Sequence, residues 1–173
     1  SIAPKIPPSR PSSKNESVLL IMADTTYDNL RFHVRRLCAT FPNSYWQAID
    51  AARAYPEAFV RAMTASGYLA ALIPEAYGGG GSTLTEAAII LEEINRSGGN
   101  AGACHAQMYI MGTLLRYGSA EQKQHYLPKI AAGDLRLQAF GVTEPDAGSD
   151  TTRIRTLAVR QGAHYVINGQ KIW

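Results

Sequence analysis

The sequence predicts an α+β fold, in which an N-terminal all-α helical bundle is followed by the beginning of an antiparallel β-domain. Apolar residues recur at helical spacing from Ser44 to Gly133. Beyond Asp134 this period is lost, and β-forming residues gather in short runs. The composition, 46% hydrophobic and 18% charged over 173 residues, is that of a globular chain long enough to bury a core.

Three segments are expected along the chain. Residues 1–23 are predicted to be a disordered or non-native tail, because their first part is rich in proline and serine and has almost nothing to bury. Met22 would make a natural start, so we hypothesise that residues 1–21 lie outside the native protein. Residues 24–134 are expected to form the helical domain. Residues 135–173 are expected to form an incomplete β-domain, because the chain stops in mid-strand and so reads as a fragment.

Two short helices are predicted first. A capping box at Ser44 and Gln47 predicts a helix over 44–54. Pro56 suits the first position of the next helix, and Gly67 ends it. The apolar stripe of this second helix is Phe59, Val60 and Met63.

A glycine-rich loop at 78–81 precedes the clearest amphipathic helix. The loop lacks a following Lys-Ser or Lys-Thr pair, which favours a turn between helices over a phosphate-binding loop. Thr83 and Glu86 form a capping box, and an apolar stripe follows. The stripe is Ala87, Ile90, Leu91 and Ile94, and the opposite face is expected to carry Glu92, Glu93 and Arg96.

Two more helices complete the predicted bundle. Residues 100–117 are apolar all round, which predicts a helix buried within the bundle. Ser119 opens a short helix, which Pro128 is expected to interrupt and Gly133 to close.

Two cysteines lack the spacing of a metal knuckle or a redox dithiol, so they are expected to be core thiols in a reducing compartment. They are Cys38 and Cys104.

The β-forming runs at 156–159 and 165–167 flank Gln161-Gly162-Ala163, which predicts a pair of antiparallel strands. Asn168-Gly169 adds a two-residue hairpin signal. Upstream, residues 142–150 read as a strand end entering a polar loop.

That loop can offer backbone N–H groups and the hydroxyls of Thr143 and Ser149 to an electron-rich ligand, since glycine lets the backbone approach closely. Local chemistry alone favours a plain polar turn.

Several classes of function are disfavoured by composition. The net charge of +3 comes without a basic run, so no nucleic-acid partner is expected. The longest apolar run, residues 18–23, is far shorter than the roughly 20 residues of a membrane span. No metal site is predicted.

Four separated stretches resemble the acyl-CoA dehydrogenase family. Residues 141–150, Gly-Val-Thr-Glu-Pro-Asp-Ala-Gly-Ser-Asp, are similar to its signature, and residues 168–173, Asn-Gly-Gln-Lys-Ile-Trp, to its companion. Residues 73–79 and 117–128 are typical of its helical domain. Two positions depart from the family pattern, Asp146 and Arg153, the second expected at the start of a strand, and they put the substrate class in doubt.

The resemblance implies a flavoenzyme with an N-terminal helical, a central β and a C-terminal helical domain, assembled as a homodimer or homotetramer. Such enzymes use FAD to oxidise an acyl-CoA thioester to an enoyl-CoA and pass electrons to an electron-transfer flavoprotein or another acceptor. The cofactor-binding residues implied are Phe140, Gly141, Val142, Thr143, Gly148, Ser149 and Trp173. The substrate-binding residues implied are Ser149 and, more weakly, Ala101, Gly102, His105, Ala106 and Tyr109.

The family's catalytic base is a glutamate expected C-terminal to residue 173, so no catalytic residue is assigned here and Glu144 is not taken as the base. The chain alone is expected to be inactive.

Three other functions stay open: an acyl-CoA oxidase, a flavin-dependent monooxygenase of the same fold, or a non-catalytic helical interaction module. The cytoplasm is the expected location, with the mitochondrial matrix as the alternative.

Overall fold

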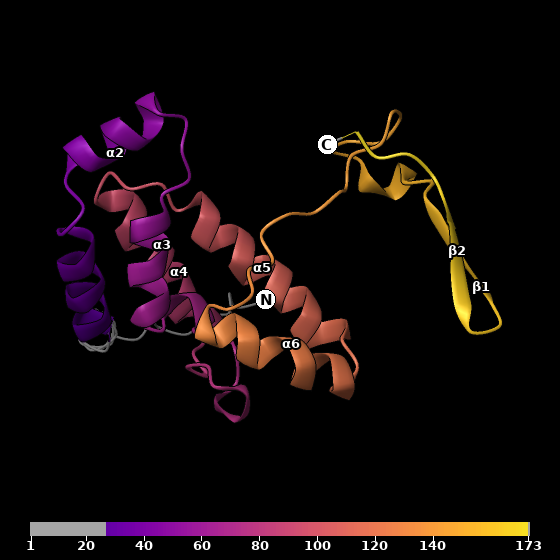
Figure 1. The fold of residues 1–173 in the computed structure, drawn as a ribbon, viewed down its shortest axis with the longest axis horizontal. Helices are drawn as coiled ribbons and strands as arrows, with labels where there is room; N and C mark the ends of the chain where they lie inside the picture. The colour runs from indigo at the N-terminus through magenta and orange to yellow at the C-terminus, as the bar shows by residue number, and fades with distance from the viewer. Residues whose placement is uncertain (1–26, 173) are drawn as a thin grey trace, which may run out of the picture. The chain divides into compact units, whose positions relative to one another are not determined.

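The computed structural model describes residues 27–172 (Figure 1). The chain divides into two compact units, which meet in sequence between Leu137 and Gln138. Helices make up the described part of the first unit and a two-stranded antiparallel sheet lies in the second, which confirms the α+β prediction. The predicted tail at 1–23 lies outside the described residues.

The helical unit opens with a helix at residues 27–38, which sequence analysis did not predict. Five labelled helices and two 3₁₀ turns follow it. They are α2 (Asn43–Ala51), α3 (Glu57–Ala65), η1 (Tyr68–Ala70), η2 (Glu75–Tyr77), α4 (Leu84–Arg96), α5 (Gly102–Tyr117) and α6 (Ala120–Ala132).

The capping prediction for α4 is confirmed and the one for α2 is wrong. Thr83 accepts a hydrogen bond from the N–H of Glu86, whose carboxylate accepts one from the N–H of Thr83. In α2 the helix begins at Asn43, with Pro42 in extended conformation as the cap, so Ser44 already lies inside the first turn. Pro56 likewise caps α3 from outside.

Pro128 lies inside α6 and does not interrupt it, contrary to the prediction. A proline removes the N–H that would bond the carbonyl four residues earlier, here that of Gln124. Gln124 is exposed, so water can satisfy this carbonyl. Gly133 ends the helix in the left-handed conformation, as predicted.

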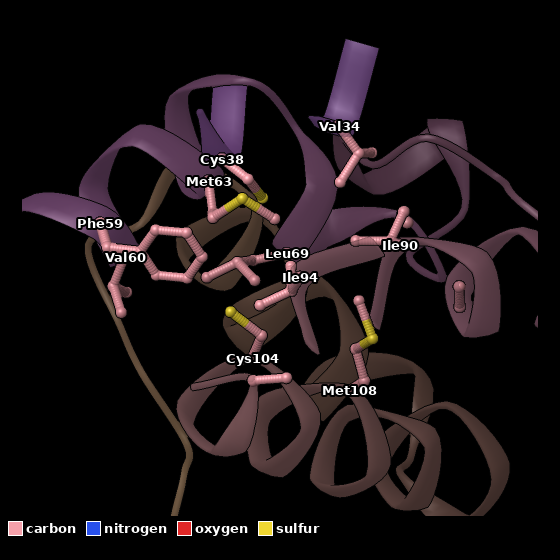
Figure 2. Close-up of a cluster of buried hydrophobic side chains, with 13 residues drawn as sticks. Val34, Cys38, Phe59, Val60, Met63, Leu69, Ile90, Ile94, Cys104 and Met108 are labelled. Carbon is pink, nitrogen blue, oxygen red and sulfur yellow. The ribbon is translucent and has the colours of Figure 1, made fainter. Parts of the chain in front are cut away.

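Two hydrophobic clusters make up the core of the helical unit. The larger one joins the helix at 27–38, α3, η1, α4 and α5, and Figure 2 shows its side chains converging from these elements. The smaller one joins α5 and α6 to the segment after η1. Both cysteines are free thiols buried in the larger cluster, as predicted, as is the α3 stripe. Burial raises the pKa of Cys104 to about 12, which keeps this thiol protonated.

Glu93 is fully buried, which contradicts its prediction as part of the outer face of α4. Its carboxylate accepts hydrogen bonds of 2.7 Å from Arg31 and from Arg35, both on the helix at 27–38. Glu93 is therefore covered by a helix that periodicity around α4 could not reveal, whereas Glu92 and Arg96 of the predicted face are exposed. An ion pair replaces apolar contact at this point of the helix packing.

Helix α5 is buried on one face only, whereas the sequence predicted burial all round. Cys104 and Met108 enter the larger cluster, and Met111 enters the smaller one. His105 and Tyr109 lie on the exposed side of the helix. The helix thus leaves a face of mixed apolar and polar character uncovered within the helical unit.

The second unit contains β1 (Leu157–Gln161) and β2 (His164–Asn168), paired antiparallel with Val159 opposite Val166. The turn between them is Gly162-Ala163, as predicted. Asn168-Gly169, in contrast, makes no hairpin among the described residues. Gly169 lies against Thr156, where a Cβ would come within 2.1 Å of the Thr156 hydroxyl oxygen.

A 3₁₀ turn, η3 (Thr151–Arg153), precedes β1, so the prediction that Arg153 starts a strand is wrong. The side chain of Asp150 caps this turn by accepting from the N–H of Thr152. Capping by Asp draws the backbone into a turn at this point.

Candidate functional site

The glycine-rich loop at 78–81 is closed by its own backbone. The N–H groups of Gly80, Gly81 and Ser82 donate to carbonyls of residues 70–73 at 2.7 to 3.1 Å. A Cβ at Gly79 would come within 2.1 Å of the Ile73 carbonyl oxygen, so the close approach needs glycine. These N–H groups are unavailable to a phosphate, which agrees with a turn between helices.

The signature loop, residues 141–150, contains a tight turn in the second unit. Glu144 and Ala147 exchange two backbone hydrogen bonds of 2.8 and 3.2 Å. The side chains of these two residues are buried, whereas Pro145 and Asp146 are exposed. The residues at both ends of the turn, Glu144 and Ala147, therefore anchor it in the second unit.

The carboxylate of Glu144 joins the turn to two other segments of the second unit, residues 155–156 and Lys171. It accepts hydrogen bonds from the N–H of Arg155 at 2.7 Å, from the N–H of Thr156 at 3.0 Å and from the Nζ of Lys171 at 2.9 Å. These donors, that of Arg155 first, lower the pKa of Glu144 to about 2. Glu144 is thus a fully paired carboxylate at neutral pH, a poor acceptor for a substrate proton.

The chain after β2 binds the carbonyl groups at the start of the signature loop. Lys171 Nζ donates to the carbonyl of Val142 at 2.9 Å, and the N–H of Ile172 donates to the carbonyl of Thr143 at 3.0 Å. Two stretches 29 residues apart in sequence are therefore held side by side. Both lie in the stretches that carry the family resemblance.

The hydrogen-bond donors of Thr143 are left unpaired. Within residues 27–172, neither the N–H nor the hydroxyl of Thr143 has a hydrogen-bond partner, although its carbonyl is occupied. The Thr143 side chain is partly exposed. At Thr143 the carbonyl acceptor is already hydrogen-bonded and the two donors are not, which suits a ligand that is rich in hydrogen-bond acceptors. The pyrimidine edge and N5 of a flavin present such acceptors, so the residues fit FAD.

Four further cofactor-site candidates lie on the loop or directly before it and are exposed. They are Phe140, Gly141, Gly148 and Ser149, with Val142 partly buried beside them. No atom lies within 4 Å of the position that a Cβ on Gly148 would take, so there is open space at this point. Trp173 lies outside the described residues.

Of the five substrate-site candidates at the start of α5, two line a pocket and three do not. His105 and Tyr109 stack edge to face, with ring centroids 4.9 Å apart, and line a pocket of about 390 Å³ within the helical unit. Ala101 is buried, Ala106 is partly buried and Gly102 is exposed, and none of the three lines this pocket.

The pocket walls contain residues that the sequence analysis did not assign to a site. The additional lining is apolar and comes from α4, α5 and the segment after η1. These residues are Leu72, Leu84, Ala87, Ala88, Leu91, Met108 and Gly112. The signal that would have indicated them is the width of the apolar stripe on α4, since Leu84 and Ala88 extend it beyond the predicted stripe.

Asp146, unlike the buried Glu144, faces solvent. Asp146 and Arg155 form an exposed ion pair at 3.4 Å, with 62% and 76% of their side chains accessible. Asp146, the unusual carboxylate, is thus directed outward.

Residues 27–172 contain no cluster of three or more His, Cys, Asp or Glu side chains suited to a metal. None of the helices in this part of the chain has the length and apolar character needed to cross a membrane.

Residues 24–134 match the family model described as "Acyl-CoA dehydrogenase, N-terminal domain". A curated relative, the probable acyl-CoA dehydrogenase FadE25 of Mycobacterium tuberculosis, is 33% identical over 161 residues, which cover 92% of this chain and 41% of the relative.

Two solved structures are also similar. A glutaryl-coenzyme A dehydrogenase in complex with glutaryl-CoA has 33% identity and a TM-score of 0.73 over 86% of this chain and 38% of its own. An acyl-CoA dehydrogenase from Bacillus anthracis, complexed with FAD, has 26% identity and a TM-score of 0.67 over 86% and 27%. The chain thus spans well under half the length of these proteins. On the family match and these relatives, the chain belongs to the acyl-CoA dehydrogenase family.

Proposed function

We propose that the natural polypeptide carrying these residues is an FAD-dependent acyl-CoA dehydrogenase, which introduces a double bond between the α and β carbons of an acyl-CoA thioester. The observation that carries the proposal is the open donor pair of Thr143 beside occupied carbonyl groups. Family membership and the FAD and glutaryl-CoA complexes of similar proteins support it.

The cofactor residues of the proposal are Phe140, Gly141, Val142, Thr143, Gly148, Ser149 and Trp173. When bound, FAD supplies the acceptor for the β-hydrogen of the substrate. The N–H and hydroxyl of Thr143 donate to the electron-rich edge of the ring, which stabilises negative charge there. Ser149, at the exposed end of the loop, contacts both cofactor and thioester.

The acyl part of the substrate is assigned to the helical unit. The pocket between α4 and α5 is apolar except at His105 and Tyr109, which suits a hydrocarbon chain whose far end meets these two rings. Gly102 and Ala106 on the same helix, and Ala101 just before it, shape its surroundings. Together these residues set the preferred length of the acyl chain.

The base that takes the α-proton is assigned to a carboxylate C-terminal to residue 173. Glu144 does not serve, because its carboxylate is buried and already accepts three hydrogen bonds. It follows that the 173-residue chain by itself catalyses no dehydrogenation. In the proposal, residues 24–134 form the helical domain and 135–173 the start of the β-domain.

The whole protein is proposed to be a homodimer or homotetramer that passes electrons to an electron-transfer flavoprotein or another acceptor. A cytoplasmic location, with the mitochondrial matrix as the alternative, accords with the two free thiols in the core.

The test uses the natural polypeptide and the variant Thr143→Val, which removes the hydroxyl donor at nearly constant volume. Loss of a hydrogen bond to the flavin is expected to weaken FAD binding by about tenfold. Titration with FAD, followed by flavin fluorescence, measures the change. Thr151→Val is the matched control, because Thr151 is exposed in η3 and its hydroxyl forms no hydrogen bond within residues 27–172. Absence of FAD binding by the unsubstituted protein, or equal affinities of the two variants, contradicts the proposal.

A further inference from the structure

Lys171 occupies a position from which it can control the Val142–Thr143 peptide group. Its Nζ donates to the carbonyl of Val142 and to the carboxylate of Glu144, each at 2.9 Å. Glu144 is only 6% exposed, and the N–H groups of Arg155 and Thr156 fix its carboxylate. This fixed carboxylate in turn holds the ammonium group of Lys171 in place.

Because the peptide group is planar, the contact between Lys171 and the Val142 carbonyl also fixes the direction of the Thr143 N–H. The carbonyl of Val142 and the N–H of Thr143 belong to one peptide group and point in opposite directions when the bond is trans. Drawing the carbonyl toward Lys171 therefore turns the N–H of Thr143 away from Lys171, and this N–H has no partner within residues 27–172.

The charge of Lys171 acts on the same peptide group. A cation on a carbonyl oxygen polarises the amide and strengthens its N–H as a donor, because hydrogen bonds in a chain reinforce one another. The carbonyl of Thr143 is occupied by the N–H of Ile172, so the next peptide is also fixed. Orientation and donor strength of the Thr143 N–H thus depend on one side chain.

We propose that Lys171, held by Glu144, is a positioning residue that directs and polarises the Thr143 N–H toward the flavin. The inference rests on the proposed function and adds to it the residues that tune the cofactor. A donor strengthened in this way stabilises the reduced, more negative flavin more than the oxidised one. Lys171 therefore raises the reduction potential of the bound flavin.

The test measures the flavin midpoint potential in the natural polypeptide loaded with FAD. Lys171→Met is expected to lose about tenfold more affinity for reduced than for oxidised flavin, which lowers the potential by about 30 mV for a two-electron couple. Lys171→Arg, which keeps a cationic donor, is expected to stay near the unsubstituted value. Arg160→Met is the matched control, since it removes an exposed cation of the same unit whose guanidinium bonds only the turn at Gly162.

A double variant guards against misfolding. Glu144→Gln with Lys171→Met removes both charges, so that no buried carboxylate is left unpaired, and it is expected to show the lowered potential as well. An unchanged potential in either flavin-loaded variant overturns the proposal. Flavin loss from both, together with loss of amide protection in β1 and β2, also overturns it, because the pair would then act only in folding. Failure of the unsubstituted protein to bind FAD defeats the proposed function itself.

Discussion

Single positions on α5 decide how much room the apolar pocket offers. At Gly112, which lines the pocket, a Cβ would meet no atom within 4 Å. Glycine is also a poor helix former, by about 1 kcal/mol relative to alanine. A larger side chain at Gly112 should therefore reduce the pocket volume and raise the stability of α5.

The variant Gly112→Leu is expected to stabilise α5 and to shorten the longest acyl-CoA that the natural polypeptide oxidises. The Cβ meets no atom within 4 Å, the rest of the leucine side chain fills pocket volume, and the helix gains about 1 kcal/mol of propensity. Relative kcat/KM over a series of acyl-CoA lengths measures the first effect and urea unfolding the second. Thr113→Leu, exposed on the same helix and absent from the pocket wall, is the control. An unchanged length profile would remove this pocket from the acyl site.

At the scale of elements, the docking of α4 on the helix at 27–38 depends on a buried ion pair. Glu93 is fully buried and bonded to Arg31 and Arg35, whereas its neighbour Glu92 is 58% exposed and bonded to Arg31 alone. Adjacent glutamates on one helix thus differ in burial while sharing a partner.

Glu93→Gln is expected to lower the free energy of unfolding of the helical unit by about 2 kcal/mol, because charge-assisted hydrogen bonds are lost in a buried place. Glu92→Gln is expected to cost less than about 1 kcal/mol, as exposed ion pairs do. Urea unfolding followed by circular dichroism at 222 nm compares them. Equal losses would show that burial of Glu93 does not matter.

The same elements show how far sequence reasoning reaches. Thr83 and Glu86 are three residues apart, so their capping box was predictable from local spacing alone. Burial of Glu93 depends on arginines 58 and 62 residues away, and no local pattern reveals such a partner. Continuity of α6 through Pro128 depends on the exposure of Gln124, which is also settled only in three dimensions.

The candidate site likewise has a part that the sequence predicts and a part that it does not. The residues of the signature loop were predictable by resemblance. Their hydrogen bonds to Lys171 and Ile172 were not, because they depend on how the chain returns after β2. The hairpin expected at Asn168-Gly169 would have led the chain back along β2, and the observed extended path instead brings residues 171 and 172 to the loop.

Over the whole molecule, both units depend on carboxylates that must stay ionised. The pKa of Glu57, beside Arg136, and that of Glu93, beside Arg35, are each lowered to about 2 in the helical unit. In the second unit the pKa of Glu144 is lowered to about 2 by the N–H of Arg155. An unfolded glutamate titrates near 4.3, so each group binds a proton more weakly in the folded than in the unfolded state.

Stability of both units is therefore expected to fall in acid. A lowered folded pKa contributes its full stabilisation above about pH 5, and this is lost progressively as the pH falls from about 5 to about 2. Urea midpoints from pH 7 to pH 2 test this, with circular dichroism at 222 nm for the helical unit and amide protection of Ile172 for the second. Glu57→Gln combined with Glu93→Gln is expected to flatten the profile of the helical unit and leave that of the second unchanged, because Glu144 belongs to the second unit. Midpoints that stay constant or rise toward pH 2 would mean that these carboxylates do not stabilise the fold.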